Sequence, residues 1–113
     1  MARFLVVDDD PDNRAVVSEA LRYMGFAVDE AASAEGALIL LEKAPPEHYD
    51  VLLTDVDMPG MSGLELVRRV RAKPDHPYTV VMSGTAEYQE VLATGAEDFL
   101  SKPFGLEALR ERF

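Results

Sequence analysis

Short apolar runs recur along the chain with polar segments between them. The runs cover residues 4–7, 26–28, 51–53, 79–82 and 99–100. Most are rich in β-branched or aromatic residues, and several are apolar continuously rather than alternately. Continuous apolarity is typical of strands that are covered on both faces, as in a parallel sheet. The runs therefore predict buried strands.

The segment after the first run has the pattern of a capped amphipathic helix. Asp10 can cap its start, Pro11 suits its first position, and Gly25 can end it. We expect its apolar positions at helical spacing to face the core; these are Val16, Val17, Ala20, Leu21 and Met24.

Four further segments also have helical spacing. Ser33 is expected to cap the second helix, and Ser62 with Glu65 has capping-box spacing at the start of the third. The fourth helix is short, from about residue 86 to 94, and Gly95 closes it. The expected inward positions are Ala34, Ala37, Leu38 and Leu41 in the second helix and Leu66, Val67 and Val70 in the third, while the fifth carries Leu106, Leu109 and Phe113.

The regular alternation of strands and helices predicts one α/β domain over residues 1–113. A chain of 113 residues suits a single hydrophobic core. Short crossovers between strands imply a mostly parallel sheet with helices on both faces. Ligands in such folds bind beyond the carboxyl ends of the strands, so the residues that follow each run are candidates for a site.

Polar side chains stand at these positions after every run. If the sheet is parallel, the side chains that directly follow a strand lie together at one edge of it. They are carboxylates, a hydroxyl and an ammonium. They are Asp8, Asp9 and Asp10 after the first run, Asp55 after the third, Ser83 after the fourth and Lys102 after the fifth, with Asp29 and Glu30 less sharply placed after the second.

This combination favours phosphoryl chemistry on a carboxylate. Clustered carboxylates resist ionising together unless a cation lies among them, and oxygen ligands without His or Cys suit Mg²⁺. Asp55 can attack phosphorus to give an aspartyl-phosphate, while Lys102 and Ser83 hold the phosphoryl oxygens. Any one Asp after a strand is commonly a turn former or a cap, as we expect for Asp10, so the prediction depends on the joint pattern.

The amino-acid composition limits the kinds of molecule that we expect the protein to bind. The formal net charge is −10, from 21 acidic and 11 basic residues, which opposes direct binding to nucleic acid or to an anionic membrane. The absence of cysteine excludes disulfides and zinc-thiolate sites. No apolar stretch approaches the roughly 20 residues that span a bilayer, and the first residues do not resemble a signal peptide, so we expect a cytoplasmic protein.

Four sequence pieces carry a resemblance to a known family. "FLVVDDDP", "VLLTDVDMPGMSGLEL", "VVMSG" and "DFLSKPF" occur in this order and cover nearly the whole chain. Together they resemble the receiver domain of two-component response regulators. The resemblance implies a flavodoxin-like, doubly wound sheet of five parallel strands in the order 2-1-3-4-5.

The resemblance also assigns the acidic residues. Asp55 matches the phospho-acceptor, and Asp8 and Asp9 match the acidic pair that binds Mg²⁺. In the family, the residue at Asp9 is a direct ligand and the one at Asp8 acts partly through water. The backbone carbonyl of Asp57 would be a further ligand.

The remaining matches concern the phosphoryl oxygens and the switch. Lys102 matches the phosphate-binding lysine, and its bond to Pro103 matches one that is cis in the family. Ser83 matches the hydroxyl that moves on activation, and Phe99 matches the aromatic that turns with it. Asp57 and Thr85 match positions that, in the family, tune the lifetime of the phosphoryl group.

The implied activity is that of a phospho-acceptor switch rather than of a turnover enzyme. A histidine kinase or phosphotransfer protein would donate the phosphoryl group to Asp55, and slow self-hydrolysis would follow. The fourth helix, fifth strand and fifth helix would address an output domain or a downstream protein. The interval from Ser83 to Lys102 is roughly three residues shorter than usual, about one helical turn, which shortens the fourth helix.

Two alternatives remain at this stage. Asp55 and Asp57 after an apolar run also resemble the DxD motif of haloacid-dehalogenase-type phosphatases, although in that family the motif precedes the acidic pair. The chain would also suit a receiver used only for docking, without phosphorylation. Turnover of a phosphomonoester would support the first alternative, and failure to take up a phosphate analogue would support the second.

Overall fold

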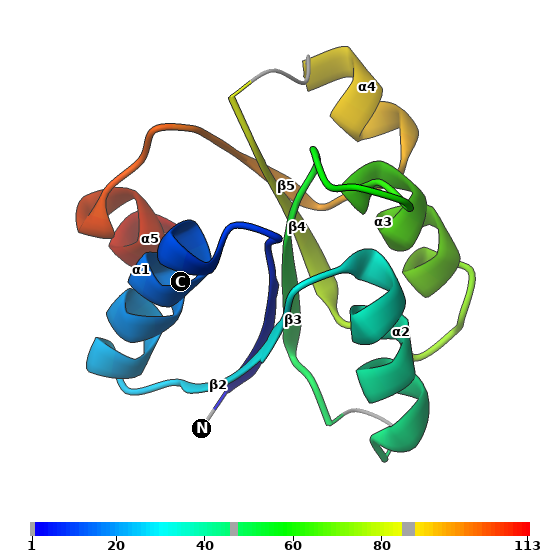
Figure 1. The fold of residues 1–113 in the computed structure, drawn as a ribbon, viewed down its shortest axis with the longest axis horizontal. Helices are drawn as coiled ribbons and strands as arrows, with labels where there is room; N and C mark the ends of the chain where they lie inside the picture. The colour runs from blue at the N-terminus through cyan, green and yellow to red at the C-terminus, as the bar shows by residue number, and fades with distance from the viewer. Residues whose placement is uncertain (1, 46–47, 85–87) are drawn as a thin grey trace.

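The computed structural model describes residues 2–45, 48–84 and 88–113. Its strands form one parallel sheet of five, in the order β2-β1-β3-β4-β5, which confirms the predicted doubly wound order (Figure 1). The strands are β1 (Arg3–Val7), β2 (Ala27–Ala31), β3 (Val51–Asp55), β4 (Tyr78–Ser83) and β5 (Asp98–Ser101).

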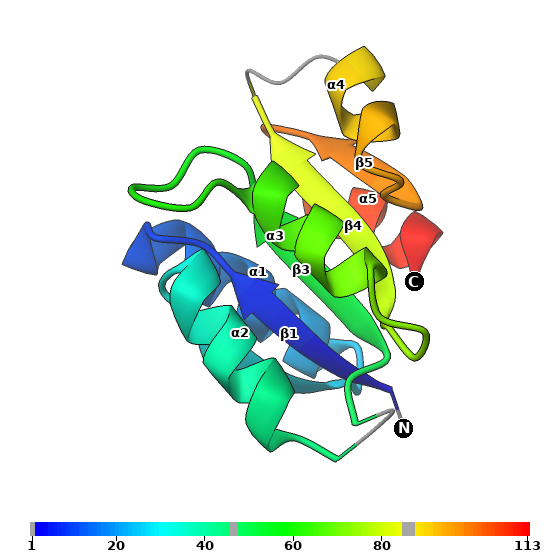
Figure 2. The same ribbon diagram turned by 90° about the vertical axis from the view of Figure 1, so that its right-hand side faces the viewer.

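Helices cover both faces of the sheet. In Figure 1, one group of helices lies on the left of the sheet and another on the right, and Figure 2 shows the second group from its own side. The first group is α1 (Pro11–Tyr23) and α5 (Leu106–Arg112); the second is α2 (Ala34–Lys43), α3 (Gly63–Arg71) and α4 (Tyr88–Ala93). No helix of the described chain is long and apolar enough to cross a membrane.

The strands are apolar continuously because both of their faces are buried. In β1, Phe4 and Val6 pack with the α1 and α5 side chains Val17, Leu21 and Leu109. Leu5 and Val7 pack on the opposite face with residues of α2 and α3. Side chains of successive strand residues point to opposite faces, so a doubly covered strand needs apolar residues at every position.

The predicted helix caps are present. The Asp10 carboxylate accepts a hydrogen bond from the backbone N–H of Asp12 at 2.9 Å, and the Ser33 hydroxyl accepts from Gly36 at 2.9 Å. The Ser62 hydroxyl accepts from Glu65 at 3.2 Å at the start of α3. Each cap satisfies an N–H that has no partner within the helix, which explains why the helices begin at these residues.

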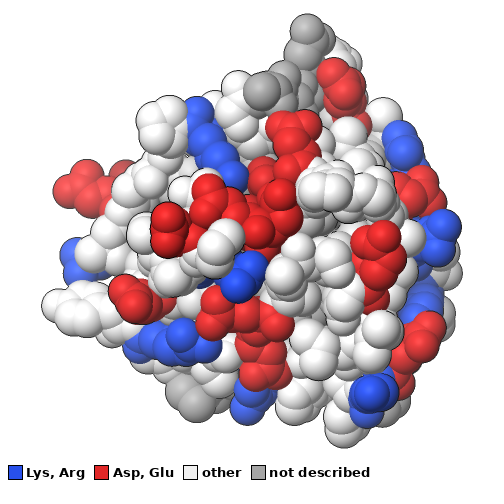
Figure 3. Space-filling view, in the orientation of Figure 1, with Lys and Arg blue, Asp and Glu red and all other residues white. Residues whose placement is uncertain are grey.

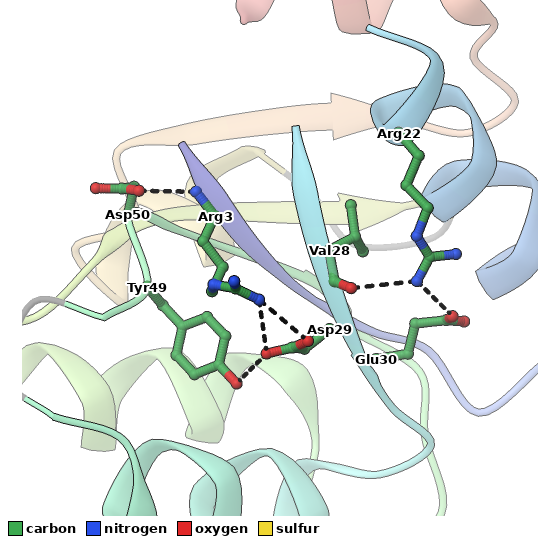
Figure 4. Close-up of polar contacts among 7 residues, drawn as sticks. All are labelled: Arg3, Arg22, Val28, Asp29, Glu30, Tyr49 and Asp50. Atoms are coloured by element: carbon green, nitrogen blue, oxygen red, sulfur yellow. Dashed lines mark hydrogen bonds and ion pairs between the residues drawn. The ribbon is translucent and has the colours of Figure 1, made fainter. Parts of the chain in front are cut away.

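The end of the second strand was predicted wrongly. Asp29 and Glu30 lie inside β2, opposite Leu5 and Val6 of β1, and do not follow the strand. This edge strand is only partly buried, so polar residues that find partners are tolerated in it. Asp29 accepts a hydrogen bond from the Tyr49 hydroxyl at 2.7 Å and pairs with Arg3, as Figure 4 shows.

One predicted core position of α1 is also wrong. The side chain of Val16 is 67% exposed, whereas Val17 and Leu21 are buried. Successive helical residues differ by about 100° in direction, so Val16 falls at the edge of the buried stripe. It lines a hollow between α1 and α5 instead of facing the sheet.

Ser18 provides a test of the packing on this face. Among the described residues its hydroxyl is the one buried side-chain oxygen without a hydrogen-bond partner, and the residue is 0% exposed. Because burial of an unpaired hydroxyl is unfavourable, Ser18→Ala is expected to raise the free energy of unfolding by about 1 kcal/mol. Urea unfolding measures the change.

The matched control for this test is Ser33→Ala. It removes a hydroxyl that caps α2, so it should lower the free energy of unfolding by about 1 kcal/mol. A loss of stability in Ser18→Ala would contradict the prediction, because it would show that the hydroxyl has a partner in solution.

Candidate functional site

The carboxyl ends of the central strands bring the predicted acids together. Val7 pairs with Thr54 across β1 and β3, so the next residues, Asp8 directly after β1 and Asp55 at the end of β3, are neighbours. Ser83 ends β4, and its backbone carbonyl accepts a hydrogen bond from the N–H of Lys102 at 2.9 Å. Parallel pairing therefore brings residues far apart in the sequence to one edge of the sheet.

Three carboxylates and one ammonium meet at this edge. One oxygen atom from each of Asp8, Asp9 and Asp55 lies within 4.8 Å of the others. The Lys102 ammonium lies 3.1 Å from an Asp55 oxygen and 3.4 Å from an Asp8 oxygen. Asp8 and Asp55 are buried, and Asp9 is exposed.

Figure 3 shows that acidic side chains gather in the middle of this face of the molecule. The area coincides with the chain between β1 and α1 in Figure 1. With the three clustered carboxylates ionised and Lys102 protonated, these four groups carry a net charge of −2. A divalent cation would neutralise that charge, and oxygen donors of this kind fit Mg²⁺.

Burial has the largest effect on the pKa of Asp55. Desolvation raises the pKa of Asp55, and the charge of Asp8 raises it further, while the hydrogen bond and charge of Lys102 oppose the shift. Burial works to lower the pKa of Lys102, but the hydrogen bonds and charges of Asp55 and Asp8 outweigh it and raise that pKa. The ammonium thus stays protonated beside a carboxylate that is costly to ionise without a further cation.

Thr54 and Gly63 lie close to the backbone carbonyl of Asp55. The Thr54 hydroxyl donates a hydrogen bond to the Asp55 carbonyl at 3.0 Å. Gly63 at the start of α3 also approaches so closely that a Cβ there would lie 1.8 Å from the same oxygen. The N–H of Gly63 donates to the Val56 carbonyl at 3.0 Å. The pattern at Ser62 predicted only a helix cap and did not indicate the role of Gly63.

The predicted switch residues lie on neighbouring strands. Ser83 is 1% exposed at the end of β4. Phe99 of β5 is half-buried against a cluster that includes Val81 and Val91. The Lys102–Pro103 bond is cis, as the resemblance implied. Asp57 is exposed next to the site. Thr85 lies outside the described residues.

The family match covers almost the whole chain. The model of the response regulator receiver domain family matches residues 4–113. The chain belongs to this family. The function of receiver domains is a phosphorylation switch in two-component signalling, and they act as phospho-acceptors rather than as conventional enzymes. The family match and the strand order of the sheet favour a receiver domain over a haloacid-dehalogenase-type phosphatase.

Curated relatives are longer proteins that contain a similar receiver domain. The chain is 41% identical to virulence sensor protein BvgS of Bordetella pertussis over 97% of its own length and 10% of BvgS. It is 35% identical to transcriptional regulatory protein TrcR of Mycobacterium tuberculosis over 97% of its length and 43% of TrcR. The chain thus spans less than half the length of either relative.

Solved receiver structures have the same fold. Chemotaxis protein CheY4 of Vibrio cholerae superimposes with a TM-score of 0.90 at 35% identity, covering 99% of this chain and 95% of CheY4. Response regulator protein TrrA of Thermotoga maritima, in complex with Mg²⁺ and BeF, superimposes with a TM-score of 0.87 at 32% identity. That match covers 99% of this chain and 96% of TrrA. These likenesses confirm the flavodoxin-like receiver fold.

Proposed function

We propose that residues 1–113 form one receiver domain that accepts a phosphoryl group on Asp55 and thereby controls an output domain or partner protein. The observation that carries this proposal is the position of Asp55. Asp55 is the last residue of the central strand β3. Its carboxylate lies 3.1 Å from the Lys102 ammonium and close to the carboxylates of Asp8 and Asp9. The donor would be the phosphohistidine of a histidine kinase or phosphotransfer protein in the cytoplasm.

The transfer requires one bond to form and one to break. A carboxylate oxygen of Asp55 attacks phosphorus, and the electron pair of the phosphorus–nitrogen bond returns to the donor imidazole. Lys102 then pairs with a phosphoryl oxygen in place of the Asp55 charge. Slow attack of water on phosphorus later releases inorganic phosphate and restores the carboxylate, which limits the lifetime of the signal.

Magnesium fits the residues at this site. Asp9, Asp55 and the backbone carbonyl of Asp57 would hold the ion directly, and Asp8 would act partly through water. When bound, Mg²⁺ neutralises the charge on the phosphoryl oxygens. The proposal is supported by the grouping of three carboxylates and by TrrA, whose structure contains Mg²⁺ and BeF.

The response to phosphorylation would run from Ser83 to Phe99. The Ser83 hydroxyl moves toward the phosphoryl oxygens, and Phe99 turns inward behind it. The buried position of Ser83 and the half-buried position of Phe99 support this direction of change. The output surface would comprise α4, β5 and α5. The described part of α4 has 6 residues.

We predict that Asp9→Asn weakens Mg²⁺ binding by at least about tenfold, because it removes one of the three clustered carboxylates. Titration with Mg²⁺, followed by NMR shifts of the amides around Asp9 and Asp55, measures the affinity. In the same variant, labelling by acetyl phosphate should need correspondingly more Mg²⁺.

Asp12→Asn is the matched control. Asp12 is also an exposed acid near the start of α1, but it is not one of the three clustered carboxylates. Its substitution should change the Mg²⁺ affinity by less than about twofold, the size of a screened surface effect. An equal response of the wild type and Asp9→Asn would contradict the proposed ligand set.

A further inference from the structure

Arg14 of α1 connects the acidic pair to the edge strand of the sheet. One of its terminal nitrogens donates a hydrogen bond to the backbone carbonyl of Asp8 at 2.8 Å. Its Nε lies 3.3 Å from a carboxylate oxygen of Glu30 in β2. The two side chains are 21% and 32% exposed, so the contacts are partly shielded from water. Arg14 therefore joins three elements through one rigid guanidinium.

The carbonyl that Arg14 holds belongs to the peptide between the two acids. Only residues 8–10 connect β1 to α1, so the backbone of Asp9 depends on the orientation of this peptide. The N–H of Asp8 donates to the Ala31 carbonyl of β2 at 3.2 Å. Asp8 is thus tied to β2 twice, directly through its N–H and indirectly through Arg14 and Glu30.

The side chain of Asp8 is held by polar contacts, as its backbone is. One carboxylate oxygen accepts from the N–H of Asp10 at 3.0 Å, and the other lies 3.4 Å from the Lys102 ammonium. The exposed Asp9 side chain has no comparable support from its surroundings in the described structure beyond the backbone that carries it. The geometry of Asp9 therefore depends on how firmly the preceding carbonyl is held.

Arg22, in the last turn of α1, makes a similar set of contacts but does not contact Asp8 or Asp9. It pairs with the same Glu30 at 3.2 Å and donates to the Val28 carbonyl at 3.1 Å, as Figure 4 shows. Arg14 and Arg22 thus each make one ion pair to Glu30 and one hydrogen bond to a backbone carbonyl. They differ in which carbonyl they hold.

We propose that Arg14, held by Glu30, is a positioning residue that orients Asp8 and Asp9 for cation binding. The inference rests on the proposed function, because it assumes that the three carboxylates bind Mg²⁺. It gives a reason for the charged Glu30 inside β2, since Glu30 fixes the guanidinium that fixes the acidic loop. Groups that orient metal ligands commonly change metal affinity by about 10- to 100-fold when they are removed.

The sign of the effect distinguishes positioning from simple charge. Arg14 is a cation near the acidic site, so its charge alone opposes binding of Mg²⁺. If charge were its only contribution, removing it would tighten Mg²⁺ binding. If it positions the acids, removing it weakens Mg²⁺ binding despite the lost repulsion.

The test compares Arg14→Met with Arg22→Met, each of which removes one charge and one bond to Glu30 and keeps an unbranched side chain. Mg²⁺ affinity is measured by calorimetric titration and by NMR shifts of the Asp9 and Asp55 amides, and stability by urea unfolding. We expect Arg14→Met to bind Mg²⁺ about tenfold more weakly and Arg22→Met to stay within about twofold of wild type. Arg14→Lys retains a charge and a donor and should bind more tightly than Arg14→Met.

The outcomes separate this inference from the function on which it rests. A wild-type chain that does not bind Mg²⁺ overturns the proposed function and the inference with it. A wild type that binds, with Arg14→Met equal or tighter, overturns the inference alone. Should Arg14→Met fold poorly, Arg14→Lys decides. Its Mg²⁺ affinity should lie below that of wild type, because one ammonium cannot reproduce both contacts of the guanidinium. An affinity equal to that of wild type would overturn the inference.

Discussion

Asp55→Asn is expected to abolish labelling of the chain by acetyl phosphate. The wild type, incubated with Mg²⁺ and acetyl phosphate, should take up a single phosphoryl group that is stable in mild acid and labile in base. The neighbouring acids should not replace Asp55, since attack on phosphorus needs in-line geometry. A misplacement of about 1 Å can cost roughly a hundredfold in rate. Intact-mass spectrometry measures the uptake.

Asp57→Asn is the matched control for this experiment. Asp57 lies two residues later and is exposed, but it is not one of the three clustered carboxylates. The variant should still take up one phosphoryl group and should change only its lifetime. Labelling of Asp55→Asn at the wild-type rate would contradict the assignment. A wild type that takes up neither a phosphoryl group nor a phosphate analogue would instead favour the docking-only alternative.

Gly63→Ala is expected to damage both the fold and the site. The added Cβ would lie 1.8 Å from the carbonyl oxygen of Asp55, 2.8 Å from its carbonyl carbon and 3.1 Å from the Cα of Val56. These are backbone atoms of the last residue of the buried strand β3 and of the residue that follows it, so neither β3 nor α3 can yield without losing packing. We expect the free energy of unfolding to fall by roughly 3 kcal/mol, at the upper end of the usual cost of overpacking.

The same change should slow phosphorylation beyond the loss of stability. If α3 and β3 move apart, the carboxylate of Asp55 shifts relative to Lys102, whose ammonium is 3.1 Å away in the intact site. Urea unfolding gives the stability, and labelling by acetyl phosphate under conditions where the variant is folded gives the rate. We expect the rate to fall by about a hundredfold, the cost of misplacement by about 1 Å.

Gly84→Ala is the control for the chemistry of the substitution. Gly84 is close to the same site, but among the described residues a Cβ there would meet only Lys102 atoms at 3.6 and 3.7 Å, which is ordinary contact. Its effect on stability should stay within about 1 kcal/mol. Wild-type stability and labelling in Gly63→Ala would contradict the close approach of α3 to Asp55.

The sequence by itself determined the elements whose causes are local. Continuous apolar runs such as residues 4–7 predicted doubly covered strands, and Asp10, Ser33 and Ser62 predicted helix starts, because a cap is satisfied within one turn. The sequence also predicted that the strand-end acids gather at one edge. Parallel strands place their carboxyl ends together whatever the details of the packing.

Only the tertiary structure decided features that depend on segments far apart in the sequence. Asp29 and Glu30 belong to β2 because partners from β1, α1 and the segment before β3 satisfy them, and hydrophobic periodicity does not register such partners. Val16 is exposed because the edge of the buried stripe of α1 depends on how the helix is rotated against the sheet. The need for glycine at position 63 arises where α3 crosses the end of β3, a contact that no local pattern encodes.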